Sequence, residues 1–206
     1  FNLEFDQNGR IKDNFEIKGF VKDGNINIFE KYNFDKLNFI FVIDNNSAKL
    51  EEIDLKFNNL ALFFKRLDIS KIKNNFLVKG EIDNKNFKID KKDIIKIFDS
   101  NDFGIQKILF NSKNIFSFRL SEKYKLSDLF IESKLKIKEL IILNKVRLKE
   151  ILPDVKDKII FQNNSLNIKY ESKKGFYLKG QGDIFIQKEI DKIYYFFEKK
   201  NQDILF

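Results

Sequence analysis

Cysteine, histidine, methionine and tryptophan are all missing from this chain of 206 residues, and proline occurs once. Without cysteine the chain forms neither a disulfide framework nor a thiolate metal site. Without histidine it lacks the commonest general base and the commonest metal ligand. There is also no P-loop and no G-x-S-x-G, and a lone Gly-x-Gly at 180–182 lacks a third glycine. We therefore expect no enzyme, no cofactor and no metal. Hydrolysis by carboxylates alone and a Ca²⁺ site stay open, although no Asp-x-Asp-x-Asp spacing supports the calcium site.

Long apolar runs are missing as well. The longest, such as 60–64, and others such as 140–143 have the length of strands, far from the ~18 residues that a membrane-spanning helix needs. No signal-peptide pattern is present. The chain begins with Phe1 and not with methionine, which predicts an internal piece of a longer polypeptide. Any membrane anchor is then expected outside this piece.

The net charge of +8 has two interpretations. It favours an anionic partner, either nucleic acid or an anionic lipid surface. It also fits a solvated lysine-rich face in a composition biased toward Lys, Asn, Ile and Phe. Only four of the 39 basic residues are arginine, the side chain preferred for reading nucleic acids. We therefore expect no nucleic-acid partner, and binding that falls steeply with salt would contradict this expectation.

Apolar and polar side chains alternate with a period of two over most of the chain. Such alternation is typical of strands with one apolar and one wet face. Polar segments at 7–9, 22–25, 44–47, 73–75 and 162–165 are suited to hairpin loops, because asparagine and glycine tolerate the left-handed conformation. The pattern predicts a mainly β fold of about a dozen strands, in a long antiparallel, curved and twisted sheet.

Two segments break this pattern and predict short helices. At 90–98, Asp90 is suited to cap a helix and Asp93 to lie in its first turn. At 146–152 a second helix would end before Pro153. Either helix would plug a sheet end, link two sheet segments or form a lid. We expect a first β-meander at 1–89, a helical insertion at 90–100 and a second β-meander at 101–206.

A weak repeat of the form Phe-x-apolar-Lys-Gly occurs at 15–19, 76–80 and 176–180. Glycine within a strand often marks a bend, a bulge or a close approach of another group. The repeat therefore indicates either strands that curve a long sheet at fixed places or a coincidence in a sequence rich in Phe and Lys.

The stretch 15–82 resembles repeated segments of the AsmA/TamB/YhdP family of large bacterial envelope proteins. It contains FEIKGFVKDGNINIF, followed by LNFIFVIDNNSAKLEEIDLKFNNLALFFKRLDISKIKNNFLVKGEI. The stretch 148–186, LKEILPDVKDKIIFQNNSLNIKYESKKGFYLKGQGDIFI, is similar to the same family. The shared features are a succession of strands and polar hairpins, and not a catalytic motif.

This resemblance implies a periplasmic protein of a Gram-negative bacterium whose parent is anchored in the inner membrane. It implies an extended sheet shaped as an open or taco-like groove that holds or conducts phospholipid acyl chains between the inner and outer membranes, supporting outer-membrane integrity. Inner- and outer-membrane proteins are implied as partners at the ends of the parent. The alternative is a closed β domain that aids outer-membrane protein assembly through its edge strands.

The apolar stripe has two possible uses. It packs against a second layer in a closed sandwich, or it stays open as a groove for lipid. For the open groove, the side chains expected to line it share apolar character and alternate strand positions: Phe15, Ile17, Leu37, Phe39, Phe41, Ile53, Leu55, Phe57, Phe76, Val78, Ile168, Phe176 and Leu178. The lysines between them are expected on the wet face, for solubility and edge protection or to attract anionic headgroups: Lys18, Lys56, Lys79, Lys169 and Lys179.

Overall fold

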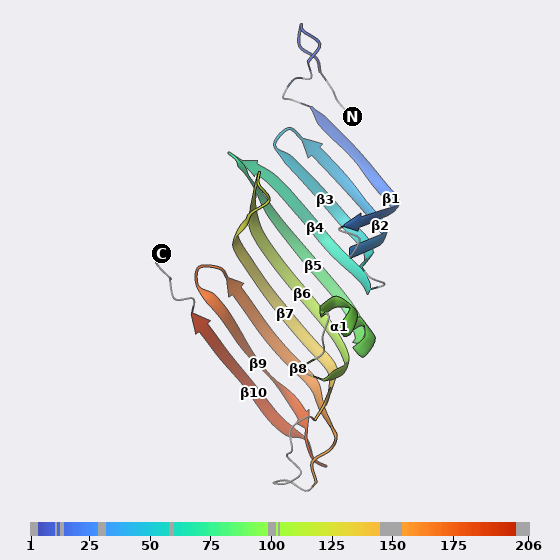
Figure 1. Cartoon of the computed structure of the whole chain (residues 1–206), viewed down its shortest axis with the longest axis vertical. Helices are drawn as coiled ribbons and strands as arrows, with labels where there is room; N and C mark the ends of the chain where they lie inside the picture. Colours follow the sequence, from blue (N-terminus) through green and yellow to red (C-terminus); the bar gives the residue numbers. More distant parts are fainter. Residues whose placement is uncertain are drawn as a thin grey trace. The chain divides into compact units, whose positions relative to one another are not determined.

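The computed structural model describes residues 4–10, 12, 15–28, 32–57, 60–98, 102, 104–144 and 154–200. Ten strands form one antiparallel sheet whose spatial order is the chain order, from β1 to β10 (Figure 1). Their bounds are β1 Glu16–Ile28, β2 Tyr32–Asp44, β3 Ser47–Phe57, β4 Leu60–Ile72, β5 Asn75–Asp90, β6 Ile105–Ser121, β7 Leu126–Leu143, β8 Lys158–Glu171, β9 Gly175–Phe185 and β10 Asp191–Lys200.

The expected mainly β fold is confirmed, and the sheet is open. All ten strands of the described residues belong to this one sheet, so none of them forms a second layer over it. A closed sandwich is therefore not what the described residues form. The strands are fewer than the dozen expected because several of them are long, reaching 18 residues in β7.

Residue contacts divide the chain into two compact units. Unit 1 comprises Phe1–Asp83 and Ile115–Ile131, and unit 2 comprises Asn84–Asn114 and Glu132–Phe206. Each unit combines two stretches that are separated in the sequence. The segments expected from the sequence, 1–89, 90–100 and 101–206, are instead consecutive along the chain.

Two predicted turns are wrong in an informative way. The turns between β2 and β3 and between β4 and β5 lie where the polar segments at 44–47 and 73–75 place them. The segment 22–25, however, lies inside β1, and 162–165 lies inside β8. Both are irregularities of a continuing strand, and Asp23 and Asn163 adopt the left-handed φ that was expected in a turn.

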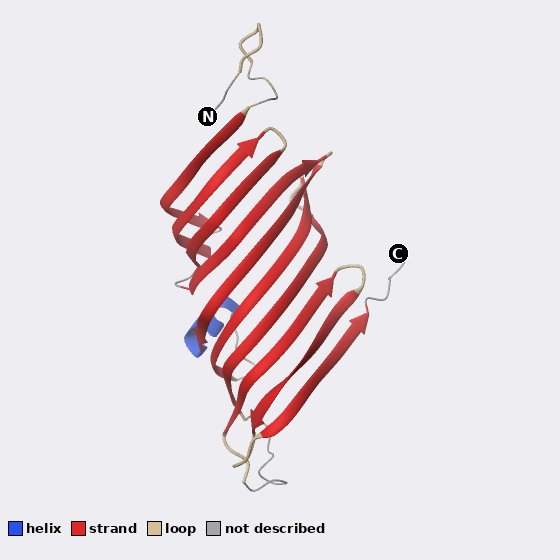
Figure 2. Ribbon diagram, turned by 180° about the vertical axis from the view of Figure 1, so that it is seen from behind, coloured by secondary structure: helices blue, strands red, loops and turns tan. Residues whose placement is uncertain are grey.

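The helix expected at 90–98 is confirmed as α1, Lys91–Phe98, in unit 2. Asp90 precedes its first turn, and the backbone N–H of Asp90 donates to the Asp93 carboxylate at 3.0 Å, which completes half of a capping box. The helix lies on the face of the sheet that is turned toward the viewer in Figure 1 and away from the viewer in Figure 2. The second expected helix, at 146–152, falls outside the described residues.

Candidate functional site

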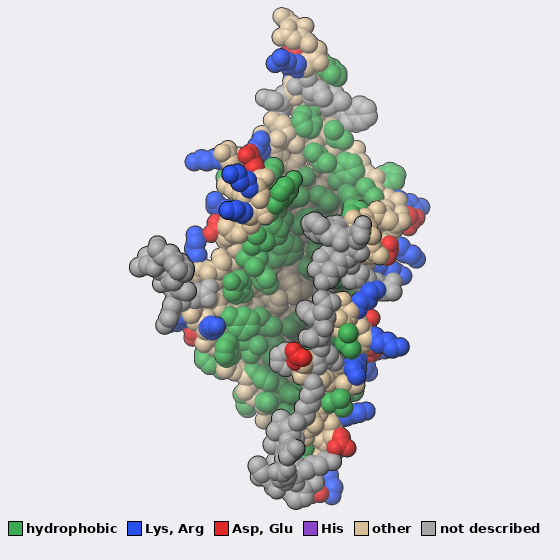
Figure 3. Space-filling view, in the orientation of Figure 1, with side chains coloured by type: hydrophobic (Ala, Val, Ile, Leu, Met, Phe, Trp, Pro, Cys, Tyr) green, Lys and Arg blue, Asp and Glu red, His purple; other side chains and the backbone are tan. Residues whose placement is uncertain are grey.

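The strand registers bring the apolar positions of unit 1 onto one face. Across three strands, Phe41 on β2 lies opposite Leu50 on β3, and Leu50 lies opposite Leu67 on β4. The next row pairs Ile53 with Phe64. Figure 3 shows hydrophobic side chains gathered on this face, with lysine and arginine side chains at its margins. Alternation in the sequence has thus become one continuous apolar surface, which we call the apolar face.

The centre of the apolar face is hollowed. A hollow of about 280 Å³ is lined only by apolar residues of β1 to β4: Ile26, Phe34, Leu37, Phe39, Leu50, Ile53, Leu55, Phe64 and Leu67. Leu37, Ile53 and Leu55 form its floor and are 9%, 5% and 6% exposed. Their burial comes from neighbours in the same sheet. The base of the hollow is therefore shielded from solvent, and its upper side is open.

Three of the nine residues that line the hollow are phenylalanines, Phe34, Phe39 and Phe64. Two of them pack against rings beside the hollow: the centroids of Phe34 and Phe57 lie 5.1 Å apart across β2 and β3, and those of Phe39 and Phe41 lie 6.1 Å apart. Both distances fall within the range of favourable ring pairs. The lining side chains offer dispersion contacts and exclude water, and they have no hydrogen-bonding groups. The hollow therefore suits a hydrocarbon chain and does not select its length.

A row of backbone irregularities crosses the strands beside the hollow. Asp23, Lys36 and Glu52 all have left-handed φ values between 51° and 53°. On β4, the register with β5 shifts between Phe64 and Arg66. A bulge inserts an extra residue and bends its strand. The row therefore marks where the strands of unit 1 bend, and it also shifts which residues reach the apolar face.

Asparagine side chains complete the backbone at these bulges. Asn38 accepts a hydrogen bond from the Asp23 N–H at 2.9 Å and donates to the Lys36 carbonyl at 2.7 Å. In unit 2, Asn164 donates to the carbonyls of Gln162 and Asp183 at 2.7 and 3.0 Å. An unpaired backbone group would cost free energy, so these amides stabilise the bent strands.

Most candidate groove residues of unit 1 lie on the apolar face. Ile17 pairs with Ile43, and Phe57 pairs with Phe34. Phe76 lies at the start of β5 and is partly exposed, and Phe15 precedes β1 and is half-buried. The structure brings together the following predicted residues of this unit: Ile17, Leu37, Phe39, Phe41, Ile53, Leu55, Phe57 and Val78.

The three candidates in unit 2 also share a face. Ile168 on β8 lies opposite Leu178 on β9, and Phe176 lies opposite Tyr170. The Phe176 ring lies 5.9 Å from that of Phe197 on β10. This unit therefore has an apolar face of its own, and the candidates are distributed over two surfaces, one in each unit.

Five residues that line the hollow escaped the prediction: Ile26, Phe34, Leu50, Phe64 and Leu67. Strict alternation from Ile53 assigns Leu50 to the wet face, but the extra residue Glu52 returns it to the apolar face. The only trace in the sequence is a slip of one position in the apolar alternation, as between Leu50 and Ile53.

The repeated Phe-x-apolar-Lys-Gly motif has a common packing role. The Phe41 ring lies over Gly19, so that a Cβ there would come within 2.6 Å of it, and the Phe116 ring lies over Gly80. In unit 2, Leu166 lies over Gly180 in the same way. In each case the missing side chain leaves room for a large apolar group from the next strand to cover the backbone.

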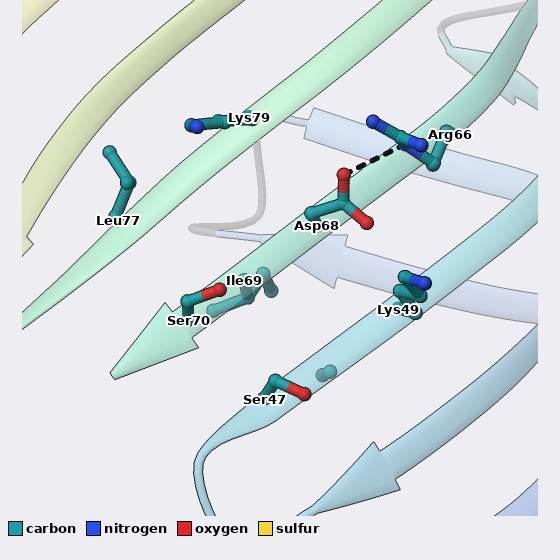
Figure 4. A pocket seen from close by; sticks show the side chains of 9 residues that line it. Ser47, Lys49, Arg66, Asp68, Ile69, Ser70, Leu77 and Lys79 are labelled. Carbon is teal, nitrogen blue, oxygen red and sulfur yellow. Dashed lines mark ion pairs between the residues drawn. The ribbon is translucent and has the colours of Figure 1, made fainter. Parts of the chain in front are cut away.

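Part of the opposite face of unit 1 carries charged side chains of both signs. Lys49, Asp68 and Lys79 lie side by side on three strands, and Arg66 makes an ion pair of 2.8 Å with Asp68 (Figure 4). Arg66 in turn lies opposite Glu51. A hollow of about 280 Å³ lies here. Its lining holds three basic side chains, Lys49, Arg66 and Lys79, and one acidic side chain, Asp68, which is paired with Arg66.

The lysines assigned to the wet face do lie away from the apolar residues. Lys18, Lys79, Lys169 and Lys179 are exposed and Lys56 is half-buried. Lys18 pairs with Glu16, and Lys169 pairs with Glu171, each at 2.8 Å. The hydrogen bond to Glu171 raises the pKa of Lys169, and bonds from Lys169 and Lys174 lower the pKa of Glu171. These surface pairs contribute little to stability.

Neither metal chemistry nor a helical membrane span is indicated in the described part of the chain. No group of three or more acidic side chains is placed there to hold a metal ion. No helix among those residues is long and apolar enough to cross a membrane. A comparison with known proteins found no match to any protein-family model, curated protein sequence or solved structure.

Proposed function

We propose that this chain is a lipid-handling segment, which holds or conducts phospholipid acyl chains on its apolar face. In this proposal it works in the periplasm, between the inner and outer membranes, as part of a longer protein anchored in the inner membrane. Its partners are acyl chains along the face and membrane proteins at the ends of the parent. The role is that of a scaffold and not of an enzyme.

The observation that carries the proposal is an open apolar face with a hollow lined by apolar side chains alone. Exposed contiguous apolar patches on soluble proteins commonly mark binding sites, because leaving them in water is unfavourable. An acyl chain of about 16 carbons gains ~13 kcal/mol when fully buried, at ~0.8 kcal/mol per methylene. Covering half of it recovers ~6 kcal/mol, which is enough to aid its transfer through water.

The width of the sheet and the length of its strands also support binding of an acyl chain. Four spacings of ~4.8 Å between β1 and β5 make this part of the sheet about 19 Å wide. The strands are long, with 16 residues in β5. Contact is expected to be spread over many side chains, so no single lining residue is expected to be essential.

Photo-crosslinking tests the proposal. A benzophenone amino acid is placed at Phe41 or Phe57 on the apolar face, and at Phe20 as a matched control. Phe20 is also aromatic and is 74% exposed, but it lies on the opposite face. The apolar positions are expected to capture phospholipid from Gram-negative cells, and Phe20 is not. Equal capture at all three positions, or none at the apolar positions, would contradict the groove.

A charge substitution provides a second test. Leu55→Asp places a carboxylate on the floor of the hollow, whereas Lys56→Asp changes the adjacent residue on the other face. We expect the first variant to lose phospholipid crosslinking from Phe41 and the second to retain it. Far-ultraviolet circular dichroism must show that both variants keep the sheet.

A further inference from the structure

The hairpin turn between β6 and β7 presents an aromatic ring to solvent. β6 ends at Ser121 and β7 begins at Leu126. Two backbone hydrogen bonds close the turn: the Ser121 N–H donates to the Lys125 carbonyl at 3.0 Å, and the Tyr124 N–H donates to the Ser121 carbonyl at 2.9 Å. Tyr124 is 85% exposed and Leu126 is 56% exposed. The turn is therefore closed by its own backbone, and the sheet does not cover its apolar side chains.

Tyr124 also has a backbone conformation that tyrosine rarely adopts. Its φ is 56°, in the left-handed region, which a hairpin loop of three residues requires and which glycine or asparagine usually supplies. Where β9 begins, after its own turn, the residue with positive φ is a glycine, Gly175. Strained residues of this kind cluster at functional sites. A strained tyrosine whose ring is exposed gains little from the sheet, which favours a contact with another molecule.

The neighbouring hairpin turn, between β4 and β5, has the same character. Phe116 on β6 covers Gly80 on β5, and each lies five residues from the turn at the end of its strand. The two turns therefore lie together at one end of adjacent strands of unit 1 (Figure 1 and Figure 2). Ile72 and Phe76, on the two sides of this turn, are 38% and 36% exposed. The two turns thus present two aromatic and two aliphatic side chains to solvent.

Both turns are basic as well. Their lysines are exposed and make no ion pair within the described part of the chain: Lys71, Lys73, Lys123 and Lys125. Glu122 is the one acidic residue in the segments 71–76 and 121–126, which we call the basic tips. Lysines around exposed aromatic and aliphatic side chains are typical of protein surfaces at an anionic bilayer, where the lysines meet phosphates and the rings lie among the headgroups.

Two other turns of the described strands lack this combination. The turn between β2 and β3, at 44–47, contains Asp44 and no lysine. The turn between β8 and β9, at 171–175, contains Lys173 and Lys174 but no large exposed apolar side chain. The combination in the basic tips is therefore not a general consequence of a composition rich in lysine and phenylalanine.

We propose that the basic tips dock unit 1 onto the surface of an anionic phospholipid bilayer. Tyr124 and Leu126 enter the headgroup region, and the four lysines contact lipid phosphates. Phe76 lies opposite Lys71, and it shares its strand face with Val78 of the apolar face. Docking therefore brings one end of the apolar face to the bilayer. The docking goes beyond the proposed function and does not require an acyl chain in the hollow.

Tryptophan fluorescence tests the docking, because the natural chain contains no tryptophan. Tyr124→Trp places a single reporter in a basic tip. Phe20→Trp is the matched control, since Phe20 is an exposed aromatic residue of the same unit that lies within β1. With vesicles of phosphatidylcholine and about one third phosphatidylglycerol, we expect the emission of the first variant to shift to shorter wavelengths and that of the second to stay unchanged. Vesicles of phosphatidylcholine alone are expected to shift neither.

Vesicle co-sedimentation separates the contributions of charge and ring. Lys123→Gln with Lys125→Gln is expected to weaken binding to the anionic vesicles about tenfold or more. Lys173→Gln with Lys174→Gln removes the same charge from another turn and is expected to leave binding unchanged. Tyr124→Gly is expected to weaken binding and yet keep or raise the free energy of unfolding, because glycine adopts the left-handed conformation without strain. A purely structural tyrosine would instead lower the free energy of unfolding when it is removed.

Three results would overturn the proposal: no emission shift of Tyr124→Trp with anionic vesicles, a shift that does not need phosphatidylglycerol, or an equal loss of binding in the two double-lysine variants. Vesicle binding and acyl-chain binding also fail separately. Docking to anionic vesicles without phospholipid capture at Phe41 would support the basic tips and contradict the groove.

Discussion

The stability of Leu55→Ala distinguishes an open apolar face from a sealed core. Leu55 is 6% exposed, lies opposite Leu62 on β4 and forms part of the floor of the hollow. The substitution removes three carbons, and at ~0.8 kcal/mol each the lost transfer free energy is about 2.4 kcal/mol. In a sealed core an additional cavity term raises the loss to about 3–5 kcal/mol. In the open face the vacated space joins the hollow, so we expect about 2.4 kcal/mol.

Urea unfolding followed by circular dichroism measures this difference. The free energies of unfolding of the natural chain and of Leu55→Ala are compared, with Lys56→Ala as a control for the neighbouring position on the other face. The control is expected to change stability by less than about 0.5 kcal/mol, as for most surface substitutions. A loss above about 4 kcal/mol for Leu55→Ala would refute an open face, because only an enclosed cavity supplies the excess.

Three further substitutions test other parts of the fold by the same unfolding measurement. Gly80→Ala is expected to destabilise unit 1 by about 1–3 kcal/mol, because the new Cβ meets the Phe116 ring, and Phe116→Leu should relieve part of this loss. Asp44→Ala removes the acceptor of the Asn46 and Ser47 N–H groups and should cost about 1–2 kcal/mol at neutral pH. Hydrogen bonding, above all from the Ser47 hydroxyl, lowers the pKa of Asp44 from its ordinary value of 3.8. The stability that Asp44 contributes is therefore present above pH 3.8 and is lost as the pH falls through the folded-state pKa. A stability difference between Asp44→Ala and the natural chain that does not change with pH would refute this reasoning. Asn164→Ala should cost about 1–3 kcal/mol by leaving two backbone carbonyls and the Tyr195 hydroxyl without this partner.

The sequence was sufficient to predict the kind of sheet and most of its apolar face. Alternation along a strand places residues on one face whenever pairing is regular, and this holds for Ile53, Leu55 and Phe57 on β3. Helix α1 was also predictable, because a capping residue and a change of period mark its start. Local chemistry is enough for features of this kind.

β-Bulges explain the turns that the sequence predicts wrongly and the residues of the apolar face that it misses. Segments 22–25 and 162–165 combine residues that tolerate left-handed φ, and a turn and a bulge require the same tolerance. What separates them is the neighbouring strand: Asn38 completes the bulge at Asp23 from fifteen residues away. A single sequence does not display that partner, so the bulges were interpreted as turns, and Leu50 and Phe64 were missed in the groove.

The high phenylalanine content acquires a physical reason in a sheet of one layer. Because none of the described strands forms a second layer over the apolar face, each strand's backbone must be covered by side chains of its neighbours, and rings reach diagonal positions that smaller side chains do not. The 25 phenylalanines include Phe41 over Gly19 and Phe116 over Gly80, where the glycine makes space for the ring. Such coverage keeps water from the backbone, yet the outer sides of the rings stay accessible. The composition that lets this sheet remain open is therefore the same one that would let it accept a hydrocarbon chain.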